Sequence, residues 1–527
     1  MPYSRIVTDA LVIGSGVAGA ACALSIASQG RQVILLSAGP DIDDGNTAYA
    51  QGGVVYAGED DTPAKLEKDI LKAGWRWNSK AAVKHLAKAG PDAVKEILID
   101  QAQVPFARRP DGGFDLTREG GHSVSRILHC ADYTGRAIMD GLKRAIREHP
   151  NIHALTNRTA VDLITSLHHT CKLAFRYSRT DQCLGAYVFN SASGDVETIM
   201  AHFTVLASGG LGRIFLHSTN AACCLGSAMT MAHRAGANLM NVEFVQFHPT
   251  ALFHRSRRRF LITEAMRGEG AHLLNSRGER FMPRYDRQAE LAPRDIVSRA
   301  IVDELHRTGE DCVYLDCRPI EQNLAQRFPT IYNKCKELGL DINNDPIPVV
   351  PAAHYHCGGV FCDVDGRTSL DRLYAVGECS CTGVHGANRL ASTSLLEGVL
   401  WGRNAGRSIA RRLHRKQHAN KRLQDSIPDW VHPGQAHNED PALIAQDWGT
   451  IRSTMWNYAG ITRTEQRLAR AAEDMRVLNR NLTEFYKRTP ISKALVDLFH
   501  GSYAAYILVL SALRNTQSVG CHYLQKD

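Results

Sequence analysis

Three glycines near the N-terminus have the spacing of a site for the phosphates of a dinucleotide. Gly14, Gly16 and Gly19 form G-x-G-x-x-G between an apolar run at 6–13 and another at 20–30. The first glycine permits a tight turn, the second lets the backbone approach a pyrophosphate, and the third lets a helix pack closely on a strand. Free N–H groups at the start of that helix would point at the phosphates. The residues predicted to bind the dinucleotide here are Gly14, Ser15, Gly16, Val17, Ala18 and Gly19.

Two later segments favour a flavin dinucleotide over a nicotinamide one. LASGG, residues 206–210, is typical of a strand that runs into a glycine pair. LYAVGE, residues 373–378, is typical of a strand that ends in Gly-Glu, where Glu378 could reach a ribitol hydroxyl. An acidic residue usually ends the second strand of such a fold and holds a ribose. Ser37 has that place here, and it can still make one hydrogen bond.

The elements that must position these residues follow a βαβ pattern. Residues 6–13 and the segment QVILLS are continuous apolar runs, as expected of parallel strands buried on both faces. The pattern places a helix between them that ends at Gly30, and it places further strands at 204–208 and 372–377. Residues 240–350 are mixed and less regularly βαβ, and the chain becomes helical after about residue 420. In that last part Leu468, Met475, Leu478 and Leu482 recur at helical spacing, which is typical of core packing.

Composition and charge set broad limits. The chain has 527 residues, of which 44% are hydrophobic and 22% charged, which is ordinary for a globular protein of several domains. The formal net charge of +8 fits attraction to acidic small molecules as well as to nucleic acid. Because there is no basic block rich in aromatic residues, we expect no nucleic-acid partner.

Apolar runs and cysteines indicate the compartment. The first long apolar run, ALVIGSGVAGAACALSIA, is broken by glycines and lacks the charged start of a signal peptide. We find no other apolar run long enough to span a bilayer, so we expect no membrane association and a cytoplasmic location. None of the 14 cysteines forms a C-x-x-C pair. This favours buried free thiols in a reducing compartment over disulfides or a metal site.

Seven further motifs carry a family resemblance. In chain order they are YAQGG, TREGGHS, FHPT, TEAMRGEG, APRD, PAAHYHCGG and GANRLASTSLLEG. On these motifs the sequence resembles the succinate dehydrogenase and fumarate reductase flavoprotein superfamily over nearly its whole length. Within that superfamily it is most similar to the L-aspartate oxidases.

The resemblance implies an α/β fold with three parts. A Rossmann-like FAD-binding domain is expected over residues 1–238 and 352–420, with an inserted α+β capping domain over 239–351. A C-terminal helical domain is expected over 421–527. The active site should lie where the capping domain meets the flavin, because ligand sites often lie between domains.

The resemblance also extends the cofactor site. In the family the Ala-Gln-Gly-Gly loop lies against the isoalloxazine, which requires small side chains. Membrane-bound relatives carry a histidine before this loop that bonds covalently to FAD. Asn46 is the matching residue here, so the resemblance implies non-covalent FAD. The further cofactor-binding residues expected are Ser37, Ala38, Asn46, Thr47, Ala48, Tyr49, Ala50, Gln51, Gly52, Gly53, Val161, Gly209, Gly210, Ser227, Glu378, Ser394 and Leu395.

A dicarboxylate substrate must be held at both ends, which requires cations and hydrogen-bond donors rather than a metal. By resemblance, Arg389 and His354 clamp one carboxylate, and His248 and Thr263 hold the other. Arg294 matches the arginine that shuttles a proton in fumarate-reducing relatives. An arginine is a poor general base at its ordinary pKa, so electrostatic activation is the conservative interpretation.

Glu119 in TREGGHS bears on the choice of substrate. Relatives restricted to dicarboxylates have an aromatic residue at this point. A carboxylate here could pair with the ammonium group of aspartate and help it lose a proton. The resemblance therefore implies FAD-dependent oxidation of L-aspartate to iminoaspartate, with oxygen or fumarate as electron acceptor. It also implies a role in quinolinate and NAD biosynthesis, with coupling to quinolinate synthase as a possible partner interaction.

Simpler interpretations of these residues stay open. His248 and His354 could be core histidines, and Arg294 could begin a helix as an ion pair with the next residue. Thr263 could be an N-terminal helix signal, and Glu119 could face solvent.

The sequence departs from the family at three places. Ser227 stands in a Gly-Ser-Ala that replaces a Gly-Asp-Gly, and Ala38 replaces a common lysine; both changes could weaken FAD binding. Val519 in the C-terminal segment SVGCHYLQKD replaces an arginine, which could loosen the helical domain or a subunit contact.

Three alternative functions remain. One is a soluble fumarate reductase or succinate dehydrogenase-type flavoprotein, and another is a flavin-binding protein with little activity. An FAD-dependent RNA-modifying protein would use the basic charge balance but would leave the dicarboxylate motifs unexplained.

Overall fold

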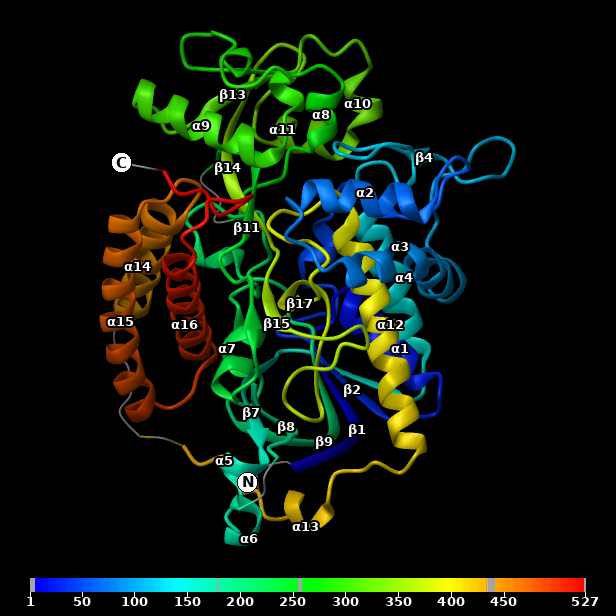
Figure 1. Ribbon diagram of the computed structural model, residues 1–527, viewed down its shortest axis with the longest axis vertical. Coiled ribbons are helices and arrows are strands. Elements are labelled where there is room, and N and C mark those ends of the chain that lie inside the picture. The colour runs from blue at the N-terminus through cyan, green and yellow to red at the C-terminus, as the bar shows by residue number, and fades with distance from the viewer. Residues whose placement is uncertain (1–4, 178–179, 255–257, 433, 435–440, 526–527) are drawn as a thin grey trace.

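A central sheet forms the middle of the molecule in the computed structural model, which describes residues 5–177, 180–254, 258–432, 434 and 441–525 (Figure 1). Its strands are β1 Arg5–Ile13, β2 Val33–Leu36, β6 Ile152–Leu155, β7 Arg158–Thr165, β8 Cys183–Asn190, β9 Val196–Leu206 and β16 Leu373–Ala375. The order is β6-β2-β1-β9-β8-β7, and β16 also pairs with β9. Strands β6, β2, β1, β9 and β16 are parallel to one another, whereas β8 and β7 extend the sheet beyond β9 in antiparallel fashion. The predicted βαβ start and the strands near 204–208 and 372–377 are therefore confirmed.

Helix α1 (Val17–Ala27) lies between β1 and β2, and every one of its residues is buried. Helix α12 (Thr393–His414) packs along α1. Two glycines of α12 make this close approach possible. A Cβ at Gly402 would lie 2.4 Å from the carbonyl oxygen of Ala18, and one at Gly406 would lie 2.7 Å from that of Cys22. Helices α1 and α12, which are far apart in the sequence, thus pack together in one layer.

The antiparallel pair β7 and β8 was absent from the sequence prediction. Both strands are almost wholly buried, so their apolar residues do not alternate with polar ones. Without that alternation, periodicity does not separate a buried strand from a buried helix segment.

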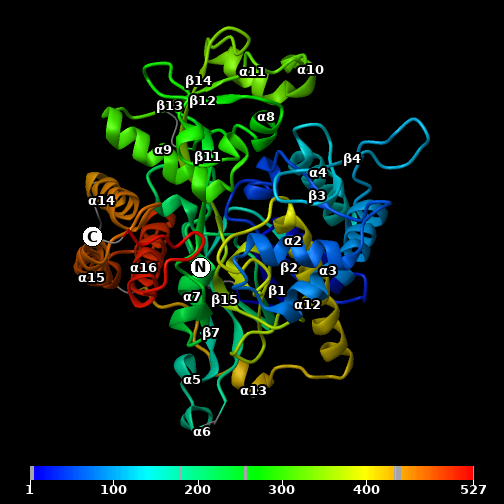
Figure 2. The ribbon, with the colours of Figure 1, turned by 45° about the horizontal axis from the view of Figure 1, so that its top comes forward.

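A second sheet stands above the central one at the top of the molecule (Figures 1 and 2). It has the antiparallel order β11-β14-β13-β12, with strands β11 Val245–Leu252, β12 His272–Leu274, β13 Val313–Asp316 and β14 Ile347–His356. Helices α8 Glu264–Gly268, α9 Arg294–Thr308, α10 Leu324–Arg327 and α11 Pro329–Glu337 accompany it. Because β14 runs through residue 351, it crosses the boundary expected there. The domain limits at 238, 351 and 420 stay a prediction.

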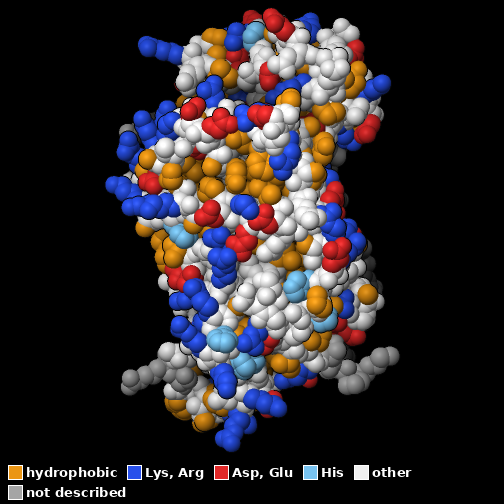
Figure 3. All heavy atoms as spheres, turned by 90° about the vertical axis from the view of Figure 1, so that its right-hand side faces the viewer, with side chains coloured by type: hydrophobic (Ala, Val, Ile, Leu, Met, Phe, Trp, Pro, Cys, Tyr) orange, Lys and Arg blue, Asp and Glu red, His pale blue; other side chains and the backbone are white. Residues whose placement is uncertain are grey.

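Smaller elements connect these parts. Two short sheets contain β3 Val54–Val55, β4 Leu116–Thr117 and β5 Ile127–Leu128, and β10 Leu239–Met240, β15 Gly359–Phe361 and β17 Ser380–Cys381. The other helical segments that precede the three long C-terminal helices are η1 Asn46–Tyr49, α2 Pro63–Ala73, α3 Lys80–Val94, η2 Lys95–Gln101, α4 Thr134–Glu148, α5 Ser166–His169, α6 Leu173–Arg176, η3 Gly212–Ile214, α7 Ser227–Arg234, η4 Met282–Arg284, η5 Ala289–Leu291, η6 Gly377–Cys379 and α13 Lys421–Gln424. On the face that carries α3, α4 and α12, basic and acidic side chains are interspersed (Figure 3).

Three long helices lie along one side of the molecule (Figures 1 and 2): α14 Pro441–Ala459, α15 Glu465–Arg488 and α16 Lys493–Arg514. In α15 the predicted stripe faces the core, with Leu468, Met475 and Leu482 buried. Helix α16 is long and apolar enough to cross a membrane, with a mean hydropathy of 1.4 over its best window. The expectation that no second apolar run has this property was therefore wrong. However, 61% of that window is buried against the rest of the protein, as in a core helix.

The C-terminal segment returns to the body of the molecule. The Cys521 N–H donates to the Ala387 carbonyl at 2.9 Å, and the buried Arg463 side chain contacts His522 Nδ1 at 2.7 Å. The segment that contains the departure at Val519 is thus attached near the loop before α12. All 14 cysteines lie among the described residues, and each is a free thiol.

Candidate active site

A cavity of about 480 Å³ lies between the central sheet, the glycine-rich loop at 45–53, the start of α7 and the loop before α12. Arg258, Phe260 and Leu261 of the upper part and Thr330 of α11 border it as well. The Thr330 N–H and hydroxyl donate to the Asp132 carboxylate at 2.9 and 2.7 Å, which joins the upper part to the lower one at the cavity. The cavity therefore lies between the upper and lower parts, and Arg389 and His354 are the predicted substrate residues that border it.

The G-x-G-x-x-G turn forms one wall of this cavity. Gly14 has φ +115°, and a Cβ there would lie 2.2 Å from the Ala207 carbonyl oxygen. A Cβ at Gly19 would lie 1.9 Å from the Gly14 carbonyl oxygen, so Gly19 packs the helix on the turn and does not border the cavity. At Gly16 the nearest atom to a Cβ would be Thr47 Oγ1, at 3.3 Å. Gly16 therefore leaves the backbone accessible at the start of α1, where N–H groups favour phosphates.

Most of the predicted cofactor residues border the cavity. Those that do are Gly14, Ser15, Gly16, Val17, Ala18, Ser37, Ala38, all residues from Asn46 to Gly53, Gly209, Ser227, Glu378, Ser394 and Leu395. Gly210 does not border the cavity. It packs against Glu378 instead, since a Cβ at Gly210 would lie 2.3 Å from Glu378 Oε1. Val161 does not either: it packs in an apolar cluster, and its carbonyl oxygen contacts His500 Nε2 at 3.1 Å. Its neighbour Ala160 borders the cavity instead, because successive residues of a strand face opposite sides.

Asn46 and Glu378 hold each other. Asn46 Nδ2 donates to Glu378 Oε2 at 3.1 Å, and Asn46 Oδ1 accepts from the Ala221 N–H at 2.8 Å. The other Glu378 oxygen accepts from the His356 N–H at 3.1 Å. Burial raises the pKa of Glu378 to about 7 despite these two hydrogen bonds. Ser37 donates its hydroxyl proton to the Asp41 carbonyl at 2.6 Å, which leaves its oxygen as an acceptor toward the cavity.

The Gly52-Gly53 pair has a reason to be small that the sequence did not reveal. A Cβ at Gly52 would lie 2.4 Å from Glu119 Oε1, and a Cβ at Gly53 would lie 2.2 Å from the Leu128 carbonyl oxygen. The backbone therefore requires glycine at Gly53, whereas a side chain at Gly52 would have to displace the end of Glu119. The prediction attributed this requirement to the isoalloxazine alone.

Two polar atoms beside the cavity lack a partner within the described chain. Gln51 Oε1 and Ser208 Oγ are both buried without a hydrogen bond, and both residues border the cavity. Buried polar groups are normally hydrogen-bonded, so a bound molecule with donors and acceptors would satisfy them. These atoms, the open turn at Gly16 and the start of α1 fit a dinucleotide.

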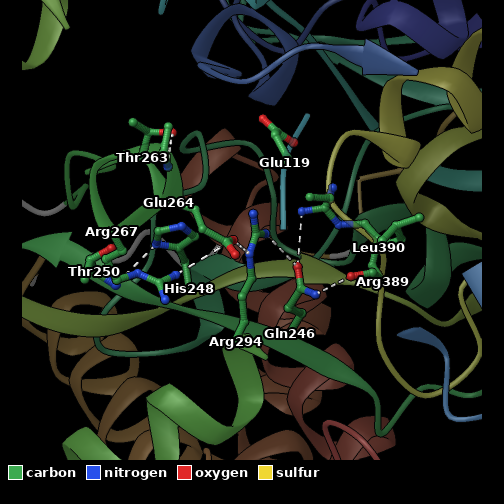
Figure 4. A network of polar contacts seen from close by, with 12 residues as sticks. Glu119, Gln246, His248, Thr250, Thr263, Glu264, Arg267, Arg294, Arg389 and Leu390 are labelled. Atoms are coloured by element: carbon green, nitrogen blue, oxygen red, sulfur yellow. Dashed lines mark hydrogen bonds and ion pairs between the residues drawn. The ribbon is translucent and has the colours of Figure 1, made fainter. Parts of the chain in front are cut away.

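Gln246 connects two arginines next to this cavity (Figure 4). Its Oε1 accepts from Arg294 Nη1 at 3.2 Å and from Arg389 Nη2 at 3.1 Å. Its Nε2 donates to the Arg389 carbonyl at 2.9 Å and to Asn388 Oδ1 at 2.6 Å. Because its Oε1 accepts two hydrogen bonds and its Nε2 donates two, the Gln246 side chain cannot rotate, and it fixes the distance between the two guanidinium groups.

The two arginines differ in how their charge is compensated. Arg294 Nε donates to Glu264 Oε2 at 2.5 Å, and Arg267 Nη2 lies 3.8 Å from the same oxygen. Burial opposes the ionisation of Glu264, but these two arginines lower its pKa to about 2. Arg294 therefore has a firmly ionised partner, rather than the adjacent Asp295 of the simpler interpretation.

Arg389 has no such partner. Its described hydrogen bonds go to Ser394 Oγ at 3.0 Å and to Gln246 Oε1, both neutral, and its Nε is buried without a partner. Its guanidinium lies 4.6 Å from the centre of the Tyr355 ring. Burial and the nearby Arg294 charge lower the pKa of Arg389 below its ordinary value. Among the described residues it forms no ion pair in direct contact, although Glu119, Glu264 and Glu378 act on its charge from farther away. A buried cation thus borders the cavity without a carboxylate in contact.

Two histidines face each other beside these arginines, with ring centres 5.3 Å apart. Burial, together with Arg294 and Arg267, holds the pKa of His248 well below its usual range. Burial, Arg389 and His248 do the same to the pKa of His354. Both rings are therefore neutral near pH 7. The Thr250 N–H donates to His248 Nδ1 at 3.3 Å, so the ring proton is on Nε2, which is left to donate.

Glu119 faces the arginines from the loop between β4 and β5 (Figure 4). Ser392 Oγ donates to Glu119 Oε2 at 2.5 Å. Burial raises the pKa of Glu119, although the Ser392 hydrogen bond and Arg294 oppose this shift. Thr263 is the N-cap of α8, and its Oγ1 accepts from the Ala265 N–H at 3.4 Å. The helix-start interpretation of Thr263 is therefore correct, while its hydroxyl proton stays available.

The structure thus brings Arg294, Arg389, His248, His354 and Glu119 together, whereas the contact described for the Thr263 hydroxyl is within its own helix start. It also adds residues that sequence reasoning missed. Gln246, Glu264 and Ser392 contact that set, and Arg267 lies beside Glu264. All four lie inside or next to quoted motifs, so position in a motif was the available signal. The contacts of Gln246 with Arg389 and of Ser392 with Glu119 cross long stretches of chain, which sequence spacing does not reveal.

Residues 9–395 match the model of the FAD-binding domain family. The chain is therefore a flavoprotein that binds FAD, as predicted. The L-aspartate oxidase of Pseudomonas aeruginosa is 44% identical over 525 residues, which cover 98% of this chain and 94% of that one. L-aspartate oxidase 1 of Ralstonia nicotianae is 43% identical over 519 residues, with coverage of 98% and 94%. This chain belongs to the L-aspartate oxidase family.

A solved structure shares the whole fold. Quinol fumarate reductase of E. coli, with a mutation in FrdA, superposes with a TM-score of 0.87 at 28% identity, over 99% of this chain and 92% of that one. The prediction of an α/β FAD-binding fold with a capping part and C-terminal helices, within this superfamily, is confirmed.

Proposed function

We propose that the protein catalyses FAD-dependent oxidation of L-aspartate to iminoaspartate, with oxygen or fumarate as electron acceptor, in NAD biosynthesis. Membership of the L-aspartate oxidase family supports the reaction. The structural observation that carries it is Arg389, a buried cation at the cavity without a carboxylate partner. An unpaired buried charge costs several kcal/mol, and the carboxylate of a substrate would relieve that cost.

The clamp on the substrate uses Arg389, Thr263 and both histidines. Arg389 and His354 bind one carboxylate, while His248 and Thr263 bind the other. Neutral histidines suit this task because His248 Nε2–H can donate to a carboxylate without depending on pH near neutrality. Gln246 keeps Arg294 and Arg389 at a fixed separation, which selects the length of the dicarboxylate.

Arg294 stabilises negative charge at the reacting end of the substrate. Its charge is held in place by Glu264, whose pKa near 2 keeps that carboxylate ionised. Because an arginine is in general a poor proton acceptor, we assign Arg294 an electrostatic role rather than that of a base.

Glu119 recognises the amine. Its carboxylate pairs with the ammonium group of L-aspartate and accepts a proton from it, which frees the amine lone pair for oxidation. The raised pKa of Glu119 makes it a better proton acceptor than an ordinary carboxylate. This role separates L-aspartate from succinate and fumarate.

The residues that hold FAD are those around the cavity, with the phosphates at Gly16 and the start of α1. FAD, when bound, supplies the two-electron acceptor for the hydride that leaves Cα. Asn46 is committed to Glu378 and Ala221, which supports non-covalent binding. Ser227 begins α7 at the cavity, where its hydroxyl and the helix N-terminus partly replace the missing aspartate.

Anaerobic titration tests the function. The protein, loaded with FAD, is mixed with L-aspartate, D-aspartate or succinate, and flavin absorbance is followed. Bleaching by L-aspartate alone is expected. If L-aspartate leaves the flavin oxidised, the proposed activity is wrong.

Fumarate reduction is a second candidate, favoured by the pair Arg294 and Arg389 together with the similarity to quinol fumarate reductase. Reduction of the flavin by succinate but not by L-aspartate would favour it. We also propose a cytoplasmic location and transfer of iminoaspartate to quinolinate synthase. Cell fractionation and co-purification test these two points.

A further inference from the structure

Ser392 precedes α12 in a conformation that serine rarely adopts. It is the N-cap residue of this helix, with φ +57° and ψ 7°, but its side chain makes no capping hydrogen bond. The left-handed region is unfavourable for residues with a Cβ, and a glycine would adopt it without strain. A serine held this way next to an active site indicates that its hydroxyl has another task.

That hydroxyl is fixed between two partners. The Gly53 N–H donates to Ser392 Oγ at 3.2 Å, and the Val55 N–H donates to the Ser392 carbonyl at 3.2 Å. Ser392 is therefore attached along β3 and does not rotate freely. A hydroxyl has one proton, and Gly53 can only donate to it. The proton must therefore go to Glu119 Oε2, which lies 2.5 Å away.

The surroundings of Glu119 make this donor important. The charged groups that face it are Arg294 at the start of α9, Arg389 before α12 and Glu264 of α8. The two arginines favour the ionised carboxylate, whereas burial and Glu264 oppose it. Besides these charges, the Ser392 hydroxyl is the side-chain donor that favours the ionised form. The other oxygen of Glu119 lies against Gly52, where even a Cβ would be only 2.4 Å away.

We propose that Ser392 is a positioning residue that keeps Glu119 ionised and aimed at the substrate amine, and thereby sets the preference for L-aspartate over dicarboxylates without an amine. This inference rests on the role proposed for Glu119. Ser392 acts through Glu119, so its loss should affect only the reaction that needs an amine. Fumarate has none, and fumarate reduction should be insensitive to Ser392.

Two variants delete the hydroxyl with opposite effects on the backbone. Ser392→Ala retains the unfavourable conformation, while Ser392→Gly removes the strain and should fold at least as well as the wild type. A hydrogen bond to a charged group is strong enough to move a carboxyl pKa by about one unit. In both variants the acid limb of kcat/KM for L-aspartate should therefore move up by about one pH unit. On that limb kcat/KM should fall about tenfold, while fumarate reduction changes less than about twofold.

Two further variants serve as controls. Ser408→Ala removes a buried hydroxyl from the same helix, where it contacts Arg367 and Tyr374, and should leave both pH profiles unchanged. Ser392→Thr retains a hydroxyl and should retain the wild-type acid limb even if the branched side chain lowers stability.

The measurements separate this inference from the proposed role of Glu119. If Glu119→Gln impairs L-aspartate oxidation selectively, but Ser392→Gly and Ser392→Ala leave the acid limb and the substrate preference unchanged, the inference about Ser392 is wrong. If Glu119→Gln lowers both reactions equally, the role of Glu119 fails, and the Ser392 inference fails with it. A shared shift in the Gly and Ala variants, restored by Thr, would support it.

Discussion

Replacing Arg389 with methionine should weaken ligand binding without weakening the fold. Arg389 is buried, and the groups that accept its hydrogen bonds, Ser394 and Gln246, are neutral. Arg294 repels it, and its Nε has no partner. Arg389→Met removes a buried charge that has no carboxylate in contact, and it retains most of the side-chain volume. Replacing buried charges with apolar groups of similar volume is often neutral or stabilising, here by about 0 to 3 kcal/mol.

The same change should be costly for binding. A carboxylate that pairs with this guanidinium gains charge-assisted hydrogen bonds worth about 2 to 3 kcal/mol. Loss of these bonds should raise the Kd for succinate about 30-fold to 150-fold. The KM for L-aspartate should rise in the same way.

Arg126 provides the matched control. It is fully buried and pairs with Asp61 at 2.8 Å and Asp69 at 2.7 Å. Arg126→Met would leave two nearly buried carboxylates without their cation, so it should destabilise the fold by about 3 to 5 kcal/mol. Binding by the folded fraction should change little, because Arg126 is not part of the proposed substrate clamp.

Urea denaturation of the ligand-free protein measures stability, and perturbation of flavin absorbance by succinate measures binding in the loaded protein. Our reasoning requires opposite outcomes for the two arginines. If Arg389→Met destabilises the fold as strongly as Arg126→Met while succinate binding persists, Arg389 is a structural cation and the proposed clamp is refuted.

Three more predictions concern carboxylates and the glycine pair. Burial raises the pKa of Glu378 from 4.5 to about 7. This group therefore contributes about 3 kcal/mol to the free energy of unfolding below pH 4.5, and the contribution is lost as the pH rises to 7. Glu378→Gln should flatten that part of the curve of stability against pH, as measured by urea denaturation. Arg294 and Arg267 outweigh burial and lower the pKa of Glu264 from 4.5 to about 2. Glu264 therefore contributes about 3 kcal/mol to the free energy of unfolding above pH 4.5, and this contribution is lost as the pH falls toward 2. The destabilisation caused by Glu264→Gln should be present at pH 7 and smaller at pH 3, and a difference that does not depend on pH would contradict this. The Gly52→Ala variant should fold and bind flavin, but the added methyl group should displace Glu119. Steady-state assays should therefore show a larger loss of L-aspartate oxidation than of fumarate reduction. Equal losses would argue against the contact between Gly52 and Glu119.

Local sequence predicted the elements of the FAD-binding part well. The apolar runs became β1, α1 and β2, because buried parallel strands and the glycine turn between them have local signatures. The pair β7 and β8 was missed, since continuous burial removes the alternation that identifies a strand. Val161 was predicted for the cofactor site, but its neighbour Ala160 borders the cavity, because successive residues of a strand face opposite sides. The apolar character of α16 was missed as well.

By itself the sequence determined the class of cofactor and the family, and it predicted the substrate residues, because these depend on residue types within short motifs. Only the tertiary structure decided how those residues act on one another. Gln246 meets Arg389 across 143 residues, and Ser392 meets Glu119 across 273. Burial then decides the charges: it lowers the pKa of Arg389 and of the two histidines, and it raises the pKa of Glu119 against the Ser392 hydroxyl and the two arginines. The strength of a charge is set by the dielectric and the partners around it, and these exist only once distant segments have packed together.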